Sequence, residues 1–339
     1  MQVKCKKNGI FFVWHNFCKG RGEMKYSWKT IFNTVLIVAA YGYLIYTFAT
    51  FDEYPALWAH FRSAGWWQFG ALALAVALMP LNIFLESVKW RYLLRKLEPM
   101  SLIEAQKQVY YGFVGAMLTP ERIGDYPTRA TRIEDKRKWL PAITLGLAGT
   151  MALSTVNMCG GLLSLAFSGL QVGGAHRGRV LALSCTLLVV FVIITLLLPA
   201  IARRYLQRHP DMKAESTWRR VVEVVKDFSP WEFPVLIGWS LLRYIVYATQ
   251  LFLVLVFCGV ELEPLQYLIV IPIHYLFVTV VPTVPVADAA VRGSVGILIF
   301  SAFTGNTAGV AITAIFLWLI NTILPTIVGT MVKPNAAQT

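Results

Sequence analysis

The chain has 339 residues, of which 57% are hydrophobic and only 14% are charged. A soluble domain carries about 25% charged residues, so this composition cannot cover a water-facing surface and predicts a protein that lies mostly in lipid. It also excludes a disordered chain, a disulfide scaffold, a collagen and a coiled coil. The formal net charge of +13 does not indicate nucleic-acid binding, because no RNP, zinc-finger or helix-turn-helix pattern accompanies it.

The chain begins with a basic segment, residues 1–27, that we expect to be a cytoplasmic tail. It contains no apolar run long enough for a signal-peptide core. Met24 starts a sequence typical of membrane proteins, so residues 1–23 are either an upstream extension or part of this tail. A single transmembrane domain is expected over residues 28–332, with a short tail at 333–339.

Apolar segments long enough to span a membrane follow one another along the chain. They predict an all-α polytopic membrane protein with about seven or eight spans. The segments are 31–51, 66–85, 140–168, 180–202, 233–260, the proline-rich 264–287, and 293–332, which is long enough for two passes with a turn near 304–306.

Two segments do not fit a simple span. The charge-free run 108–120 has 13 residues, which is too short to cross a bilayer, so we expect a re-entrant or interfacial segment. The segment 264–287 contains four prolines and is either a kinked span or a second re-entrant hairpin.

Lysine and arginine set the expected orientation, because basic loops stay in the cytoplasm. Residues 1–29 hold seven basic residues and one acidic residue, and 89–138 hold eleven basic and six acidic residues. We therefore place both segments, and the arginine-rich loop 203–232, inside. The loop 52–65 should lie outside. This arrangement requires the segment 108–120 to return to the side from which it enters.

A weak internal repeat relates the two halves of the chain. Each copy contains an Arg-Tyr pair, a Pro-broken apolar segment and an Asp-x-x-x-Arg motif, from Arg91-Tyr92 to Arg129 in the first half and from Arg243-Tyr244 to Arg292 in the second. The copies begin on opposite sides of the membrane in this topology, as in inverted-repeat transporters. Strings this short also recur by chance, so the repeat and a chance similarity stay open.

Charged residues within apolar segments need a partner or a function. Glu86 and Lys89, three positions apart, are either a pair on one helix face or an interfacial pair that reaches the headgroups. Arg243, Tyr247 and Gln250 share one helix face. The Arg243 guanidinium suits a lipid phosphate; the alternatives are an arginine that reaches the inner interface or one paired with Asp288.

The two Asp-x-x-x-Arg motifs are the other candidate headgroup sites. Asp288 and Arg292 can pair on one helical turn, whereas Pro127 makes a regular helix between Asp125 and Arg129 doubtful. The alternative for both motifs is a surface ion pair of small energy. The expected lipid-headgroup residues are Arg243, Arg129, Arg292, Arg91, Glu86, Asp125, Asp288, Tyr247 and Gln250, with helix breaks at Pro120, Gly124, Pro282 and Pro285.

Other polar residues and the missing motifs narrow the function. We interpret His274 as a packed histidine and the asparagines 82, 157, 306 and 321 as interhelical hydrogen-bonding residues. The sequence contains neither a P-loop nor a G-x-S-x-G motif, no Cys-x-x-Cys and no nucleophile–base pair. We therefore expect no metal, no cofactor and no enzymatic activity.

Residues 85–94 (LESVKWRYLL), together with 118–125 (LTPERIGD) and Arg129, resemble the flippase-like transmembrane family of lysylphosphatidylglycerol synthases. Segment 282–292 resembles the second Pro/Gly-rich segment of that family. The family's Gly-Glu-x-x-Arg reads Gly124-Asp125 here, with Arg129 one position later. The resemblance implies a membrane domain that moves a phospholipid or polyprenyl-linked lipid between leaflets, without the aminoacyl-transferase domain of the full synthases.

These observations predict a protein of the bacterial cytoplasmic membrane that flips an anionic, aminoacylated or polyprenyl-linked lipid. Its expected partners are a phosphatidylglycerol-type or polyprenyl phosphate-type lipid, a second copy of the chain or an envelope enzyme, and no nucleic acid. One alternative is a non-transporting subunit that presents lipid to, or anchors, a separate envelope enzyme. The other is an intramembrane lipid-phosphate transferase.

Overall fold

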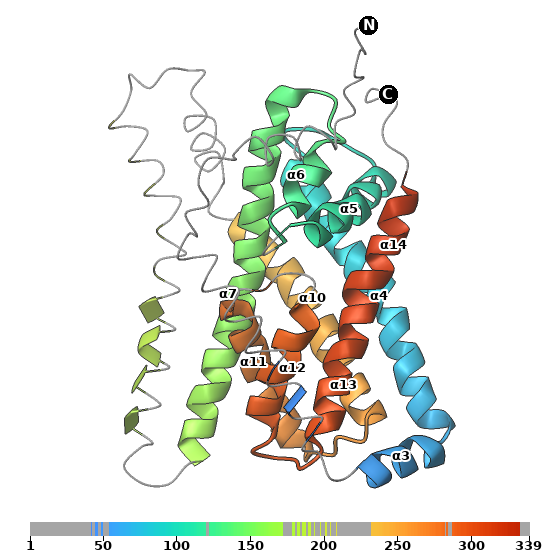
Figure 1. Ribbon diagram of the computed structural model, residues 1–339. Coiled ribbons are helices and arrows are strands. Elements are labelled where there is room, and N and C mark those ends of the chain that lie inside the picture. Colours follow the sequence, from blue (N-terminus) through green and yellow to red (C-terminus); the bar gives the residue numbers. More distant parts are fainter. Residues whose placement is uncertain are drawn as a thin grey trace, which may run out of the picture.

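The computed structural model describes residues 54–119, 122–171, 232–281 and 287–332, with Thr283 and scattered positions in 42–49 and 178–208. In these ranges every regular element is a helix, which confirms the predicted all-α class (Figure 1). The elements are α3 (Tyr54–Ser63), α4 (Trp66–Leu94), α5 (Leu102–Met117), α6 (Asp125–Ala130), η2 (Lys136–Lys138), α7 (Trp139–Gln171), α10 (Glu232–Phe257), α11 (Pro264–Val280), α12 (Asp288–Phe300), α13 (Thr307–Trp318), the π-helical turn η3 (Leu319–Ile323) and α14 (Leu324–Met331).

Four helices of the described part are long and apolar enough to cross a membrane. They are Trp66–Leu94, Lys136–Ser168, Glu232–Phe257 and Thr307–Met331. They confirm the spans expected at 66–85, 140–168 and 233–260 and the second pass within 293–332. Most of the span expected at 31–51 and most of the one at 180–202 lie outside the described residues.

The segment from 264 to 300 forms two short helices. α11 has 17 residues and α12 has 13. At 1.5 Å per residue they are about 26 Å and about 20 Å long, shorter than a hydrocarbon core of about 30 Å. The expected first pass of 293–332 is therefore wrong as a full span, because α11 ends at Val280 and α12 is a separate helix that begins at Asp288. Pro282 and Pro285, the predicted breakers, are outside the described residues.

Helices α4 and α10 form a central antiparallel pair. Near one end, Arg95, which follows α4, lies 2.5 Å from Glu232 at the start of α10. Farther along, Gln250 Nε2 donates to the carbonyl oxygen of Ala75 at 2.9 Å. At the other end, the rings of Phe69 and Phe257 are in contact. The two helices therefore run in opposite directions along their length.

A pair of helices follows each of these central helices, at opposite ends of the molecule (Figure 1). α5 and α6 lie at the end where α4 finishes. The start of α7 lies at the same end, because Lys138 Nζ, just before α7, pairs with Glu98, just after α4, at 2.6 Å. α11 and α12 lie at the end where α10 finishes. There Asn306 Nδ2, just before α13, donates to the carbonyl oxygens of Cys258 and Gly259 at 3.1 and 3.0 Å.

Helix contacts repeat in the same register in the two halves. Gly329 on α14 lies so close to α5 that a Cβ there would overlap the carbonyl oxygen of Tyr110. A Cβ at Gly161 on α7 would lie 2.9 Å from the carbonyl oxygen of Pro272 on α11. Gly161 is 22 positions beyond the first residue of α7, and Gly329 is 22 positions beyond the first residue of α13. The residues that they contact correspond in the same way, because Tyr110 and Pro272 are each 8 positions beyond the first residue of α5 and α11.

This register supports the Asp-x-x-x-Arg part of the predicted repeat, because Asp125 and Asp288 are the first residues of α6 and α12. It does not support the Arg-Tyr part. Arg91 lies in the last turn of α4, whereas Arg243 lies near the middle of α10. The two arginines therefore occupy different positions in their half-domains, and only the later motif is a true counterpart.

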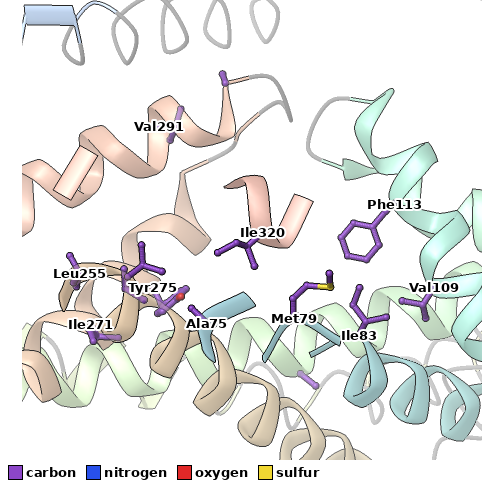
Figure 2. Close-up of a cluster of buried hydrophobic side chains, with 14 of the residues drawn as sticks. Ala75, Met79, Ile83, Val109, Phe113, Leu255, Ile271, Tyr275, Val291 and Ile320 are labelled. Carbon is purple, nitrogen blue, oxygen red and sulfur yellow. The ribbon is translucent and has the colours of Figure 1, made fainter. Parts of the chain in front are cut away.

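The halves meet in one apolar core. Figure 2 shows Ile320 of η3 between Tyr275 of α11 and Met79 of α4, with Phe113 of α5 close by. Ile320 lies in the π-helical turn η3, just before Pro325. Proline has no N–H, so in a regular α-helix it would leave the carbonyl oxygen of the preceding turn without a hydrogen-bond donor. The core thus joins α4 and α5 to the second half around the place where the last span is irregular.

Candidate functional site

Glu86 of α4 is the centre of a buried charge cluster. It is 2% exposed, and its carboxylate accepts hydrogen bonds from three cations. Lys89 Nζ lies 2.9 Å away on the same helix, Arg129 Nη1 of α6 is also 2.9 Å away, and Arg243 Nη1 of α10 completes the set. The predicted helix pair of Glu86 and Lys89 is confirmed, and it is buried. A carboxylate in apolar surroundings requires such pairing.

Arg129 joins this cluster to α6. Its Nε and Nη2 donate to the two carboxylate oxygens of Asp125 at 2.6 and 2.8 Å, a bidentate pair. Its guanidinium also lies 5.3 Å from the ring of Trp90 and 4.8 Å from that of Tyr126. A planar arginine group gains from such aromatic faces. Arg129 is therefore held by charge and stacking together.

The doubt that Pro127 raises about a regular helix between Asp125 and Arg129 is resolved in favour of the helix. α6 begins at Asp125, so Pro127 falls in its first turn. An N–H there has no intrahelical acceptor, and proline loses nothing by lacking one. The helix forms, and it sets Asp125 and Arg129 on one face.

Gly124 ends the irregular link before α6, as predicted. Its N–H donates to Thr119 Oγ1 at 2.7 Å, and a Cβ there would overlap the carbonyl oxygen of Gly115 on α5. At Gly112 a Cβ would overlap the carboxylate of Asp125. Small residues on α5 therefore let α6 approach closely enough to place its ion pair. Pro120, the other predicted break, lies outside the described residues.

Arg243 reaches the same cluster from α10. Its Nε donates to Asn82 Oδ1 at 2.7 Å, its Nη1 to Glu86, and its Nη2 to the Tyr247 hydroxyl at 2.7 Å. The suggested pair with Asp288 is not formed, because Arg243 faces α4. Gln250 follows on the same helix but is buried against Ala75, away from the cavity.

The second Asp-x-x-x-Arg motif forms its own pair. Arg292 Nε donates to Asp288 Oδ1 at 2.7 Å, which confirms the predicted pairing on one turn of α12. The Asp288 side chain is 4% exposed, and the Thr283 hydroxyl lies 3.2 Å from the same oxygen. The Arg292 side chain is 31% exposed, so its outer nitrogens remain accessible.

A cavity of about 480 Å³ connects the two charged groups. Residues from both halves line it, on α4 to α7 and on α10 to η3. Arg91 is exposed on α4 and is not among them. Four arginines and three carboxylates line the cavity, which gives these side chains a net charge of +1. They are Arg122, Arg129, Arg243, Arg292, Glu86, Asp125 and Asp288.

The exposed residues of the cavity lining lie just before α6, on α6 and on α7. Ile123 and Leu147, both lining residues, are 63% and 55% exposed. Pro127 and Thr150 are exposed beside them. The exposed part of the lining is therefore mostly apolar, whereas the charged side chains lie deeper.

Two polar side chains of the cavity were not predicted to act there. Arg122, between the predicted breaks, has a φ of 56°, and its guanidinium lies 5.1 Å from the Phe113 ring. A left-handed conformation outside glycine is strained and is found most often at functional sites. His274 is buried as expected, but its Nδ1 has no hydrogen-bond partner. Only the position of Arg122 within 118–125 could have indicated it.

The asparagines that were predicted to form interhelical hydrogen bonds do so in part. Asn82 contacts Arg243, and Asn157 Nδ2 donates to Thr279 Oγ1 at 2.9 Å, so both are interhelical as predicted. Asn306 contacts the loop after α10 and caps α13. Asn321 of η3 instead lines the cavity, and its Oδ1 has no hydrogen-bond partner. Among the described residues, no group of three or more His, Cys, Asp or Glu side chains is arranged to hold a metal.

The fold and the cavity define an all-helical, multi-pass membrane protein with a buried, charged site. The chain belongs to the family of the lysylphosphatidylglycerol synthase TM region, whose family model matches residues 31–329. This membership confirms the predicted resemblance and indicates a lipid-related membrane function. A search of curated proteins finds no match.

Proposed function

We propose that the protein translocates an anionic, aminoacylated or polyprenyl-linked lipid across the bacterial cytoplasmic membrane, with its N-terminus in the cytoplasm. One observation carries the proposal: a cavity of about 480 Å³ holds four arginines and three carboxylates among membrane-spanning helices. Charge at this depth is costly and marks a pathway for a polar group. A guanidinium matches the oxygens of a lipid phosphate.

The shape of the cavity favours a lipid over a wholly soluble solute. The headgroup of a lipid would occupy the charged interior, while the acyl chains of the lipid would pass the exposed apolar residues Ile123 and Leu147. Arg122, which also lines the cavity, would attract an anionic headgroup as it enters. Such an arrangement removes the headgroup from the hydrocarbon without pulling its chains out of it.

The proposal includes two re-entrant hairpins. α5 with α6, and α11 with α12, each leave and return to one end of the molecule, and the ends are opposite. Irregular backbone between such short helices is tolerated where it lines a cavity. Rocking of one hairpin against the other would expose the site to each leaflet in turn. The movement would follow a gradient or a coupled ion, and the covalent structure of the lipid would stay the same.

A reconstituted assay tests the proposal. Purified protein is placed in liposomes with labelled phosphatidylglycerol, lysylphosphatidylglycerol or a polyprenyl phosphate, and access of the label from outside is followed over time. Wild type and Arg91→Gln, a substitution outside the cavity, should both accelerate exchange between leaflets. The charge-balanced double variant Glu86→Gln/Arg243→Gln, checked for folding, should not.

Two results would refute translocation. Exchange equal to that of protein-free liposomes for every lipid would favour the non-transporting partner role. A chemically altered lipid recovered from the liposomes would favour a transferase.

A further inference from the structure

We infer that Arg292 is the subsite for the phosphate of the ligand, with His274 and Asn321 lining the same cavity, and that the arginines around Glu86 are not. The inference rests on the proposed function, because it assigns a subsite within the same cavity. It follows from which hydrogen-bond donors are already used.

Arg129 and Arg243 are engaged at every guanidinium nitrogen. Each of the three guanidinium nitrogens of Arg129 donates to Glu86 or Asp125. Those of Arg243 donate to Asn82, Glu86 and Tyr247. Turning either arginine toward a ligand would remove a partner from the buried Glu86 carboxylate. Loss of one member of a buried ion pair is strongly unfavourable.

Arg292 is engaged at one nitrogen only. Its Nε donates to Asp288, while Nη1 and Nη2 donate no hydrogen bond within the described part of the chain. Arg292 lines the cavity, and the Asp288 pair leaves its outer fork of donors unused. A fork of this kind binds phosphate oxygens in a bidentate manner.

Two further polar groups in the cavity lack a partner. His274 is 6% exposed, and its Nδ1 makes no hydrogen bond. Its ring lies near Gly296, one turn after Arg292, where an added Cβ would come within 3.6 Å of the imidazole. Asn321 Oδ1 is also buried and unpaired. Buried polar atoms are almost always hydrogen-bonded, so these two indicate a ligand or water.

The donor and acceptor types select a class of ligand. Arg292 supplies donors for a phosphate, whereas Asn321 Oδ1 can only accept and therefore needs a donor from the ligand. A phosphodiester whose headgroup carries a hydroxyl or an amine satisfies both groups. A phosphodiester capped by a methyl group would leave the asparagine oxygen unpaired.

Binding in detergent tests the subsite separately from transport. Calorimetry would compare wild type, Arg292→Gln, Arg292→Lys and the control Arg91→Gln, with dihexanoyl phosphatidylglycerol as probe. Loss of a charge-assisted hydrogen bond predicts a Kd raised roughly 10- to 100-fold in Arg292→Gln. Arg292→Lys keeps the positive charge and the pair with Asp288 but lacks the fork of donors, so its Kd should lie between those of wild type and Arg292→Gln. Arg91→Gln should bind as wild type does.

The headgroup class is tested with Asn321→Leu. Wild type should prefer dihexanoyl phosphatidylglycerol over dihexanoyl phosphatidylmethanol by roughly 2- to 10-fold, and Asn321→Leu should abolish the preference. Glycerol phosphate and inorganic phosphate distinguish a lipid from a soluble anion. Binding of these as tight as that of the lipid would overturn the assignment to a lipid headgroup.

The subsite and the proposed function fail in different ways. Unchanged lipid affinity in folded Arg292→Gln and Arg292→Lys would overturn the subsite even if the liposomes exchange lipid. Tight, Arg292-dependent binding without any exchange would support the subsite and refute translocation.

Discussion

Replacement of Glu86 by glutamine removes the only negative charge that Lys89, Arg129 and Arg243 share. Asp125 is then the one carboxylate left in the cluster with these three cations, so the net charge of the cluster rises from +1 to +2. Glu86 is 2% exposed, and water cannot compensate. Breaking a buried ion pair costs about 3–5 kcal/mol. We expect Glu86→Gln to lower the free energy of unfolding by that amount, measured by denaturant titration in detergent.

The Glu98–Lys138 pair provides the matched control. Its side chains are 31% and 34% exposed, so Glu98→Gln should cost less than about 1 kcal/mol. The double variant Glu86→Gln/Lys89→Met restores the net charge and should be more stable than Glu86→Gln alone. If Glu86→Gln and Glu98→Gln destabilise the protein equally, by less than about 1 kcal/mol, the cluster is not the desolvated centre described above.

Three other substitutions, with Gly238→Ala as their control, test helix packing in a thermal unfolding assay. Gly329→Ala should destabilise by about 1–3 kcal/mol, because its Cβ would meet the backbone of α5 rather than a movable side chain. Gly161→Ala, in the equivalent contact, should cost less, since its nearest backbone atom lies 2.9 Å away; Gly238→Ala, with nothing within 4 Å, should be neutral or stabilising in the same thermal unfolding assay. Asn306→Ala should cost about 1–2 kcal/mol, because it removes the α13 cap and two contacts to the loop after α10. A stable Gly329→Ala protein would contradict the close approach of α14 to α5.

Local charge spacing was enough to predict part of the site. Glu86 with Lys89 and Asp288 with Arg292 pair as expected, because residues three and four apart on a helix are neighbours. The long apolar runs likewise predicted the four described spans. The effect of Pro127 could not be predicted, because a proline breaks a helix in its interior but fits in its first turn, and the sequence does not show where α6 begins.

The long-range part of the site has no such signal. Arg243 and Glu86 are 157 positions apart, and Arg129 and Glu86 are 43 apart. Only the antiparallel packing of α4 on α10 and the glycine contacts of α5 with α6 bring them together. The same packing decides that Arg91 faces outward and that Arg292 keeps two unused nitrogens. Side-chain type alone makes these arginines equivalent, and tertiary contacts separate them.

The opposite directions of the two halves affect how the chain enters a bilayer. Turned upside down, the molecule exchanges α5 and α6 for α11 and α12 and keeps a similar framework around its cavity. Its ends differ mainly in charge: Arg95 and Lys96 follow α4, whereas Glu261 and Glu263 follow α10. Insertion orientation then depends on a few loop residues.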